Sequence, residues 1–360
     1  MQRASRDIKR VVVKIGSSLF CSSGNAVDPS ILNGIVREQI AKLAEDGCRV
    51  CVVCSGAKAP GKKTLGLSER PRTLAGLQAA AAVGQNALMN AFQKAMPADC
   101  HCAQVLLTWE DFTDRERWLN ARGTLNRLMG SGYAGRTIIP VINENDTVST
   151  NEIRFGDNDQ LSARVACLVD ADLLVILSDV DGLYDGDRKT IPVVDAITPE
   201  IRALACPTSR KTCVGGMITK LDAAKIAVDS GIPCVIANGR KAGIILDAVS
   251  SPARAGTLFL PRKKGLALRE RWIAFGTKPK GSIMVDDGAR RALCDHKSLL
   301  SVGIVGLDGA FGAGEIVSIV DRNGEKFAVG KTHFGSAALD KLKGRRHDRE
   351  IVHRDNIVIL

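Results

Sequence analysis

Aromatic residues are scarce in this sequence: they make up 4% of the chain, with three Trp and two Tyr among 360 residues. The hydrophobic core must therefore be built from aliphatic side chains, chiefly Val, Ile, Leu and Ala. Short runs of such residues are typical of buried parallel strands that are covered by helices on both faces. The scarcity of aromatic residues therefore favours an α/β fold.

Long apolar segments are also missing. No apolar run approaches the ~20 residues that a membrane-spanning helix requires. The first residues, MQRASRDIKR, are basic and lead directly into a strand-like run, without the apolar segment and cleavage site of a signal peptide. We therefore expect no membrane association and a cytoplasmic location.

Cysteine, by contrast, is plentiful, with eleven residues, but its spacing indicates neither a disulfide framework nor a metal site. Cys51 and Cys54 form a C-x-x-C pattern within a strand-like run, where side chains three positions apart point to opposite faces. Cys100 and Cys102 have no second ligand pair at zinc spacing. The cysteines therefore indicate a reducing compartment, and we predict no metal ion held by protein side chains.

The length of 360 residues allows about two domains of ~150 residues each. The composition changes over Ser250–Gly265, which is rich in turn-forming and charged residues. We place the domain boundary there, and expect a first domain over residues 1–260 and a second over residues 268–360.

Strand-like and helix-like segments alternate through the first domain, which predicts a doubly wound, mostly parallel sheet. The expected strands are Arg10–Ile15, Arg49–Cys54, Val105–Thr108, Ile138–Ile142, Leu173–Leu177 and Pro233–Ala237. The expected helices are Pro29–Gly47, Leu77–Met96, Arg115–Leu128, Gln160–Val169 and Leu221–Ser230. The expected loops between them include Ala59–Leu67 and Lys211–Lys220.

The second domain consists of shorter alternating runs divided by Gly, which predicts a small, mainly β domain, for which a barrel is one arrangement. The expected strands are Ser282–Val285, Val302–Val305, Glu315–Val320 and Lys326–Val329, and the expected helices are Gly288–Leu293 and Ser336–Leu342. From Leu260 onward 19 Lys and Arg stand against 12 Asp and Glu, so this part carries most of the net charge of +11. That excess indicates either an anionic partner or simply a basic surface.

The most informative stretch is Thr137–Asp159, TIIPVINENDTVSTNEIRFGDND. Its β-branched run ends abruptly in the sequence NEND, and a short spacer leads to GDND. A buried strand that ends in carboxylates and amides delivers polar groups to the carboxyl edge of a sheet, where open α/β folds bind ligands. A solvated loop with Asx turns is the alternative interpretation of this stretch.

Three other strands also end in small and polar residues. Lys14 and Gly16 end the first strand, Ser55 follows the second, and Ser178 and Asp179 follow the strand over 173–177. Gly permits close approach of the backbone to a ligand, and successive amides in such a turn can bind phosphate. The first turn is neither a Walker loop nor a dinucleotide fingerprint, so Lys14 by itself is equally well explained as an exposed lysine at a strand end.

Several segments, taken in order, resemble the glutamate kinases, a branch of the amino acid kinase family. They are VVVKIGSS, CSGAKAPGKKTLGL, PVINENDTVSTNEIRFGDNDQLSA, LSDVDGLYD and GGMITKLDAAKIA. The tail, with RWIAFGTKPKGSIMVDDGA and KSLLSVGIVGLDGAF, is similar to the PUA domain that follows many of these kinases. The resemblance covers nearly the whole chain, and NENDTV with the later GDND is its most specific part.

The resemblance implies a kinase that uses ATP and Mg²⁺ to phosphorylate the γ-carboxylate of L-glutamate, the first step of proline biosynthesis. The catalytic residues would be Lys14, Lys220 and Asp159, and the substrate-binding residues would be Ser55, Asp146, Asn158 and Asn143. The ATP-binding residues would be Lys14, Gly16, Ser178, Asp179, Val214, Gly215, Gly216, Met217, Ile218, Thr219 and Lys220. Mg²⁺ would be held mainly by the phosphates of ATP.

The chemistry implied by the resemblance agrees with the residue types. Phosphoryl transfer needs mainly alignment and charge neutralisation from the protein. The γ-carboxylate is itself the nucleophile, so no general base is required, and no His occurs in these motifs. The resemblance also implies a homo-oligomer, either a dimer or a tetramer, and glutamyl phosphate reductase as a downstream partner.

Two positions depart from the family's pattern. Cys213 and Val214 replace the usual Gly-Thr before Gly-Gly-Met, which removes a hydroxyl that could touch phosphate. Lys58 stands where a small or apolar residue is usual, and Pro60 follows it. We expect these departures to affect the kinetics, the feedback response or the substrate affinity rather than the reaction itself.

Two kinds of alternative remain open. Related kinases phosphorylate aspartate, acetylglutamate, carbamate or a nucleotide, whereas most PUA domains serve RNA-binding or RNA-modifying proteins. Recognition of single-stranded RNA needs aromatic side chains interleaved with basic ones. The aromatic residues of the tail are scattered and are equally well explained by a core: Trp272, Phe275, Phe311, Phe327 and Phe334. We therefore expect that RNA binding is not the main role.

Overall fold

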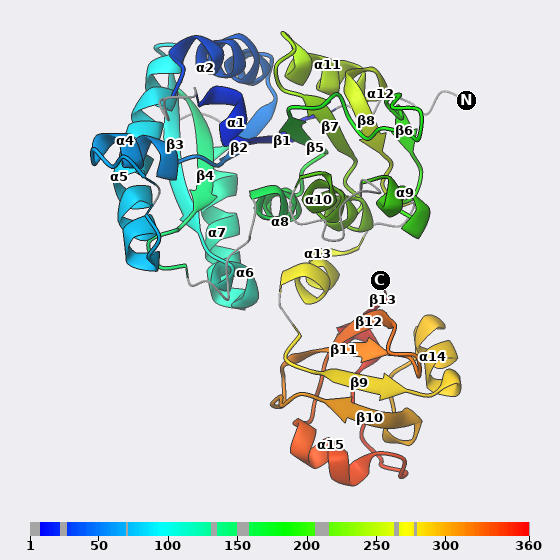
Figure 1. The fold of residues 1–360 in the computed structure, drawn as a ribbon. Helices are drawn as coiled ribbons and strands as arrows, with labels where there is room; N and C mark the ends of the chain where they lie inside the picture. Colours follow the sequence, from blue (N-terminus) through cyan, green and yellow to red (C-terminus); the bar gives the residue numbers. More distant parts are fainter. Residues whose placement is uncertain are drawn as a thin grey trace. The chain divides into compact units, whose positions relative to one another are not determined.

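The computed structural model describes residues 8–21, 27–69, 71–130, 135–149, 158–205, 216–262, 266–276 and 279–359. The chain forms two compact units (Figure 1). The larger unit spans Met1–Asp111 and Arg115–Gly265, and the smaller unit comprises Phe112–Asp114 and Leu266–Leu360.

The larger unit is built on an eight-stranded sheet with the order β3-β4-β2-β1-β5-β7-β8-β6. The strands are β1 (Arg10–Ile15), β2 (Arg49–Cys54), β3 (Cys100–Leu107), β4 (Thr137–Glu144), β5 (Leu173–Ser178), β6 (Val193–Val194), β7 (Cys234–Asn238) and β8 (Gly256–Phe259). Every neighbouring pair is parallel except β7 and β8, which are antiparallel. The predicted α/β fold with a mostly parallel sheet is therefore confirmed.

Helices cover both faces of this sheet. One face is covered by α2 (Pro29–Ile35), the π-helical η1 (Val36–Ala41), α3 (Lys42–Glu45), α5 (Leu74–Ala95) and α11 (Ile244–Ser250). The strands also pack against α7 (Arg115–Leu128), α8 (Asn158–Leu168) and α10 (Met217–Asp229). The remaining short helices of this part are α1 (Ser17–Phe20), α4 (Lys58–Thr64), α9 (Pro199–Leu204) and α12 (Pro252–Ala255). Helix α6 (Glu110–Thr113) is divided between the two units, because Phe112 and Thr113 belong to the smaller one.

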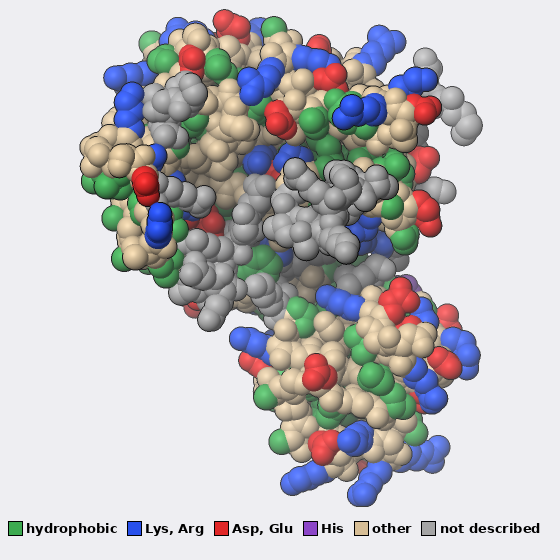
Figure 2. Space-filling view, in the orientation of Figure 1, with side chains coloured by type: hydrophobic (Ala, Val, Ile, Leu, Met, Phe, Trp, Pro, Cys, Tyr) green, Lys and Arg blue, Asp and Glu red, His purple; other side chains and the backbone are tan. Residues whose placement is uncertain are grey.

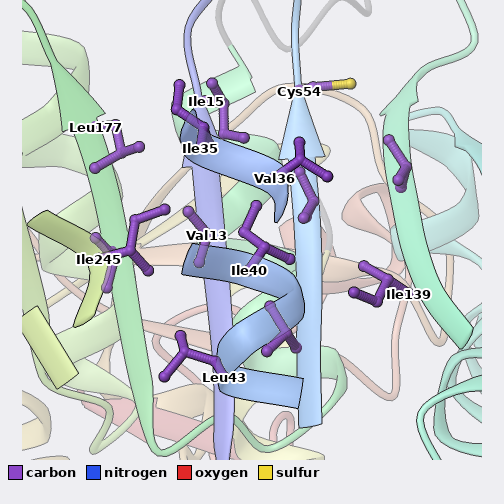
Figure 3. Close-up of a cluster of buried hydrophobic side chains, with 14 of the residues drawn as sticks. Val13, Ile15, Ile35, Val36, Ile40, Leu43, Cys54, Ile139, Leu177 and Ile245 are labelled. Carbon is purple, nitrogen blue, oxygen red and sulfur yellow. The ribbon is translucent and has the colours of Figure 1, made fainter. Parts of the chain in front are cut away.

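Side chains along β1 alternate between the two faces of the sheet. Val13 and Ile15 lie in the aliphatic cluster with Ile40 and other residues of the helices on that face (Figure 3). Because successive strand residues point to opposite faces, Lys14 points away from this cluster and toward α8. A charged side chain thus enters the interior of the sheet's other face, where only 4% of its surface is exposed.

The prediction of a loop over Ala59–Leu67 is wrong, because most of this segment forms helix α4. Gly61 allows α4 to pack directly on α5: a Cβ at Gly61 would lie 1.7 Å from the carbonyl oxygen of Ala80. A Cβ at Gly84 would likewise lie 1.7 Å from the carbonyl oxygen of Ala57. This backbone contact overrides the low helix propensity of Gly, so composition alone was misleading.

Only the end of the predicted loop over Lys211–Lys220 lies in the described part of the chain. Its residues up to Gly215 lie outside the described part of the chain. Its last four residues do not form a loop, because α10 begins at Met217. Thr219 and Lys220 therefore belong to the first turn of a helix, which fixes the direction of their side chains.

The smaller unit contains a five-stranded sheet with the order β10-β9-β11-β12-β13, in which only β9 and β11 are parallel neighbours. The strands are β9 (Ser282–Val285), β10 (Ile304–Asp308), β11 (Ile316–Val320), β12 (Lys326–Lys331) and β13 (Ile357–Ile359). The helical segments are α13 (Leu268–Arg271), η2 (Trp272–Gly276), α14 (Asp287–Cys294), η3 (Ser301–Gly303), α15 (Ser336–Leu342) and η4 (Arg354–Asn356). This confirms the prediction of a small, mainly β fold for the tail.

Four aromatic residues of the tail pack against its hydrophobic clusters. Phe311 is buried, and Phe327 and Phe334 pack against the same hydrophobic cluster. Trp272 packs against a second cluster, while the side chain of Phe275 lies outside the described part. On the face that Figure 2 shows, the Lys and Arg side chains of this unit are interspersed with Asp and Glu. Phe311, Phe327, Phe334 and Trp272 thus contribute to packing within this unit.

None of the described helices is long and apolar enough to cross a membrane.

Candidate active site

Asp159 is the centre of a buried charged group at the carboxyl edge of the larger sheet. It lies in the first turn of α8, and its side chain is fully buried. Its Oδ1 lies 2.5 Å from Nζ of Lys14, and its Oδ2 lies 3.1 Å from Nζ of Lys220. The hydroxyl of Thr219 donates to the same Oδ2 at 3.0 Å. One carboxylate therefore positions two lysines that come from opposite ends of the unit's sequence.

The charge of this group follows from its surroundings. Burial alone would raise the pKa of Asp159, but the positive charges of Lys14 and Lys220 outweigh burial and hold the pKa below its usual value. Asp159 is therefore ionised at neutral pH. Two ammonium groups and one carboxylate leave an excess of positive charge, which is suited to an anion such as phosphate.

The first turn of α10 supplies one of the two lysines. Gly216, with φ 78°, precedes Met217, and its carbonyl oxygen lies 2.9 Å from Oγ1 of Thr219. Ile218 completes the turn before Lys220. Free backbone N–H groups and the dipole at a helix N-terminus favour a bound anion. The predicted nucleotide-binding residues Val214 and Gly215 lie outside the described residues.

The turns after β1 and β2 approach each other closely. The backbone N–H of Ser17 donates to Oγ of Ser55 at 3.1 Å. Gly56 has φ 110°, and a Cβ there would lie 2.8 Å from the Cβ of Ser17, so this position requires Gly. Gly16 lies beside the charged group, since its own Cβ would be 3.7 Å from Nζ of Lys14. The first two strand ends are thus joined around Lys14.

A chain of buried amides connects four elements behind this edge. Asn158 of α8 donates its Nδ2 to Oδ1 of Asn143, in β4, at 2.8 Å and to the carbonyl oxygen of Cys54, in β2, at 2.5 Å. Asn143 in turn donates to Oε1 of Gln85, in α5, at 2.9 Å. Buried polar groups that bond to one another in this way hold their elements in one arrangement.

A cavity of about 400 Å³ lies next to the charged group. Asn158, which lines it, directly precedes Asp159. All four predicted substrate-binding residues line this cavity: Ser55, Asn143, Asp146 and Asn158. Lys58 also lines it, and its Nζ lies 2.7 Å from Oδ1 of Asp146. The volume and the polar lining are suited to a small, charged ligand.

Ser178 and Asp179 lie at the same edge of the sheet but do not line this cavity. The register of β5 against β1 pairs Ile176 with Lys14, so Ser178 ends its strand beside Gly16. The hydroxyl of Ser178 donates to Oδ1 of Asp179 at 3.3 Å. These two residues therefore border the charged group from the side opposite to the cavity-forming strands β2 and β4.

Sequence reasoning missed two features of the site. Gln85 was not singled out, because it is one of several polar residues in the predicted helix Leu77–Met96, which corresponds to α5. The ion pair between Lys58 and Asp146 was also missed. Its only signal in the sequence is the cation at a position that is usually small or apolar.

The buried cysteines of the described residues contribute to packing. Cys54 lies in the core cluster with Val52, whereas Cys51 lies outside that cluster, as predicted for opposite faces. Burial raises the pKa of both thiols, that of Cys54 to about 12. In the described ranges, no group of three or more His, Cys, Asp or Glu could hold a metal ion.

Comparison with known proteins gives matches over both units. Residues 9–238 match the model of the amino acid kinase family, and residues 281–354 match the model of the PUA domain. Glutamate 5-kinase of Geobacter sp. (strain M21) is 45% identical over 374 residues, which cover 99% of this chain and 98% of that protein. Glutamate 5-kinase of Moorella thermoacetica (strain ATCC 39073 / JCM 9320) is 43% identical over 371 residues, which cover 98% of this chain and 96% of that protein.

One solved structure, carbamate kinase from Giardia lamblia bound to AMP-PNP, is 18% identical in sequence and has a TM-score of 0.48. The match covers 70% of this chain and 98% of that chain. That likeness is too distant to support an argument. The sequence matches confirm the resemblance on which the expected kinase activity was based.

Proposed function

Because the chain belongs to the amino acid kinase family, we propose that it phosphorylates the γ-carboxylate of L-glutamate with ATP, giving L-glutamyl 5-phosphate and ADP. The observation that carries this proposal is the group Lys14–Asp159–Lys220 beside a cavity that Ser55, Asn158 and Asp146 line. The group is suited to a phosphoryl donor, and the cavity is suited to a small acceptor.

The two lysines account for the transfer itself. An oxygen of the γ-carboxylate bonds to the γ-phosphorus of ATP while the bond from that phosphorus to the bridging oxygen breaks and ADP departs. Negative charge spreads over the transferring oxygens, and fixed cations stabilise this charge most in the transition state. Asp159 holds Lys14 and Lys220 in place before the substrates arrive, so little reorganisation is needed during the reaction.

The cavity accounts for the acceptor. Ser55 lies at its end near the charged group, and its hydroxyl is placed to orient the γ-carboxylate, while Asn158 lines the same end. Asp146 supplies the negative charge that the α-ammonium group requires. Asn143 supports Asn158 through the hydrogen bond between their side chains.

We place the phosphoryl donor, ATP, on the side of the charged group that α10 forms. The first turn of α10, with Gly216 before it, is suited to the phosphates of ATP. Ser178 and Asp179 border the same edge and complete the proposed nucleotide site. Mg²⁺ bound to the phosphates would neutralise part of their charge.

The reactivity of the product indicates the pathway and the next enzyme in this proposal. A mixed anhydride of a carboxylic and a phosphoric acid hydrolyses readily, so the proposal includes glutamyl phosphate reductase as the next enzyme and proline biosynthesis as the pathway. A cytoplasmic location follows from that pathway, and a dimer or tetramer remains the proposed assembly.

An assay of ADP release against a panel of acceptors tests the proposal. Purified protein with ATP and Mg²⁺ should release ADP with L-glutamate, and much more slowly with aspartate, acetylglutamate or carbamate. Hydroxylamine in the assay should trap the γ-glutamyl hydroxamate. ADP release with aspartate or carbamate but not with glutamate would overturn the proposed substrate.

A further inference from the structure

Lys58 occupies a position that the helix itself does not favour. It is the first residue of α4, where a positive charge is unfavourable toward the helix dipole. Its side chain is 36% exposed and reaches Oδ1 of Asp146 at 2.7 Å, whereas the side chain of Asp146 is only 10% exposed. The cation thus neutralises a carboxylate that is largely removed from water.

The two side chains of this ion pair face the same cavity. Lys58 and Asp146 both line it, together with Ser55 and Asn158. The pair therefore presents one cation and one anion to a ligand whose other end reaches the group around Asp159. The α-carbon of an amino acid carries the complementary pair of charges, an ammonium and a carboxylate.

We propose that Lys58 is a specificity-determining residue that binds the α-carboxylate of the amino-acid substrate while Asp146 binds its α-ammonium. This inference rests on the proposed function. On binding, the ion pair within the protein is exchanged for two ion pairs with the substrate.

The exchange keeps Asp146 neutralised in both states. In the free protein Lys58 is its counter-charge, and in the complex the ammonium of the substrate takes that role. A largely buried carboxylate without a counter-charge would be strongly unfavourable. A ligand that lacks the ammonium cannot complete the exchange, and a ligand that lacks the α-carboxylate leaves Lys58 without a partner.

A second cation reinforces the same side of the cavity. Lys62 lies one helical turn after Lys58 and also lines the cavity. Glu144, the other acidic residue of the lining, accepts a hydrogen bond from the hydroxyl of Ser149 at 3.1 Å. Lys63, the next residue along α4, is exposed and does not line the cavity, which makes it a matched control.

The experiment compares wild type, Lys58→Met, Lys58→Arg and Lys63→Met as full-length chains of equal thermal stability. Calorimetry gives Kd for L-glutamate and for 4-aminobutyrate, which lacks the α-carboxylate, and the coupled assay gives kcat and KM. We expect Lys58→Met to raise Kd and KM for glutamate about tenfold, the effect of losing one charge-assisted hydrogen bond, with kcat within about twofold. Its Kd for 4-aminobutyrate should not rise.

The controls separate charge recognition from packing. Lys58→Arg should bind glutamate within about threefold of wild type because it keeps the charge, and Lys63→Met should match wild type. A glutamate KM that falls or stays constant in Lys58→Met would overturn the inference, because Lys58 would then only obstruct Asp146. Equal losses for glutamate and 4-aminobutyrate would also overturn it, since they would indicate a structural role.

Failure of the proposed function gives a different result. If wild type binds glutamate but does not phosphorylate it, the kinase proposal fails, and the two Kd values still decide the role of Lys58. If wild type does not bind glutamate, both proposals are overturned.

Discussion

Oδ2 of Asp159 lies 3.1 Å from Nζ of Lys220, although 61 positions separate the two residues in the chain. The contact joins the first turn of α8 to the first turn of α10, and the other carboxylate oxygen holds Lys14 of β1. Three elements of the larger unit therefore meet at one carboxylate, and the proposed transfer of phosphate depends on that meeting.

Removal of either lysine should slow turnover. We expect Lys14→Met and Lys220→Met to lower kcat by ~10²-fold, about 3 kcal/mol, because each lysine stabilises charge that develops in the transition state. The KM for glutamate should change less than kcat. Steady-state assays check this, with Lys42→Met as a control, since Lys42 forms an exposed ion pair with Asp46. A KM effect without a kcat effect would show that the lysines act only in binding.

Asp159→Asn should destabilise the fold and make it respond more strongly to ATP. Lys14 and Lys220 would lose their shared counter-charge in a site where they are 4% and 11% exposed, at a cost of about 3 kcal/mol or more. The phosphates of ATP replace that counter-charge, so ATP should raise Tm more in Asp159→Asn than in wild type. Differential scanning fluorimetry measures both effects, and Asp46→Asn is the exposed control. A smaller response to ATP in Asp159→Asn would contradict the electrostatic account.

The contribution of Asp159 to stability should disappear in acid. Its folded pKa is lowered by Lys14 and Lys220 against the effect of burial, so the unfolded state binds the proton more readily. The stabilisation is complete above the unfolded pKa of ~3.9 and is lost as the pH falls through the lower folded pKa. Urea unfolding of wild type and Asp159→Asn should give a constant difference from pH 5 to 8 that narrows below about pH 4. A difference that grows on acidification would have the wrong sign.

The contact between α4 and α5 should not tolerate a methyl group. Gly84→Ala would place a Cβ 1.7 Å from the carbonyl oxygen of Ala57, which forces the two helices apart and costs about 1–3 kcal/mol. Since Lys58 follows Ala57, the KM for glutamate should rise as well. Gly123→Ala is the control, because a Cβ at Gly123 of α7 meets nothing within 4 Å and should stabilise the helix by about 1 kcal/mol. Equal stability of the two variants in urea would exclude the close contact.

Much of the fold could be predicted because its signals are local. The apolar runs that became β1, β2 and β5 are short, buried and bounded by Gly or polar residues, and helix α7 matches its predicted range Arg115–Leu128. Polar residues directly after such strands had to reach one edge of the sheet, so Ser55, Asn143 and Asp146 could be expected near one another. Their proposed roles in binding remain predictions.

The rest depended on contacts between distant segments. Helix α4 was missed because its Lys, Pro and Gly content indicates a loop, whereas the packing of Gly61 on Ala80 stabilises a helix. The pairing of Lys58 with Asp146 joins residues far apart in sequence, and no local pattern encodes it. The role of Gln85 could not be predicted for a similar reason, because its hydrogen-bond partner Asn143 lies on another element.

Transfer of ¹⁸O from the γ-carboxylate of glutamate to phosphate tests the central claim most directly. In the presence of ATP, Mg²⁺ and hydroxylamine, glutamate labelled with ¹⁸O in both γ-carboxylate oxygens should give the hydroxamate and inorganic phosphate that carries one ¹⁸O atom. This result is predicted because the carboxylate oxygen attacks the γ-phosphorus and leaves with phosphate when hydroxylamine attacks the carbonyl carbon. Phosphate without ¹⁸O, or ADP release without hydroxamate, would contradict the account, because water would then be the acceptor.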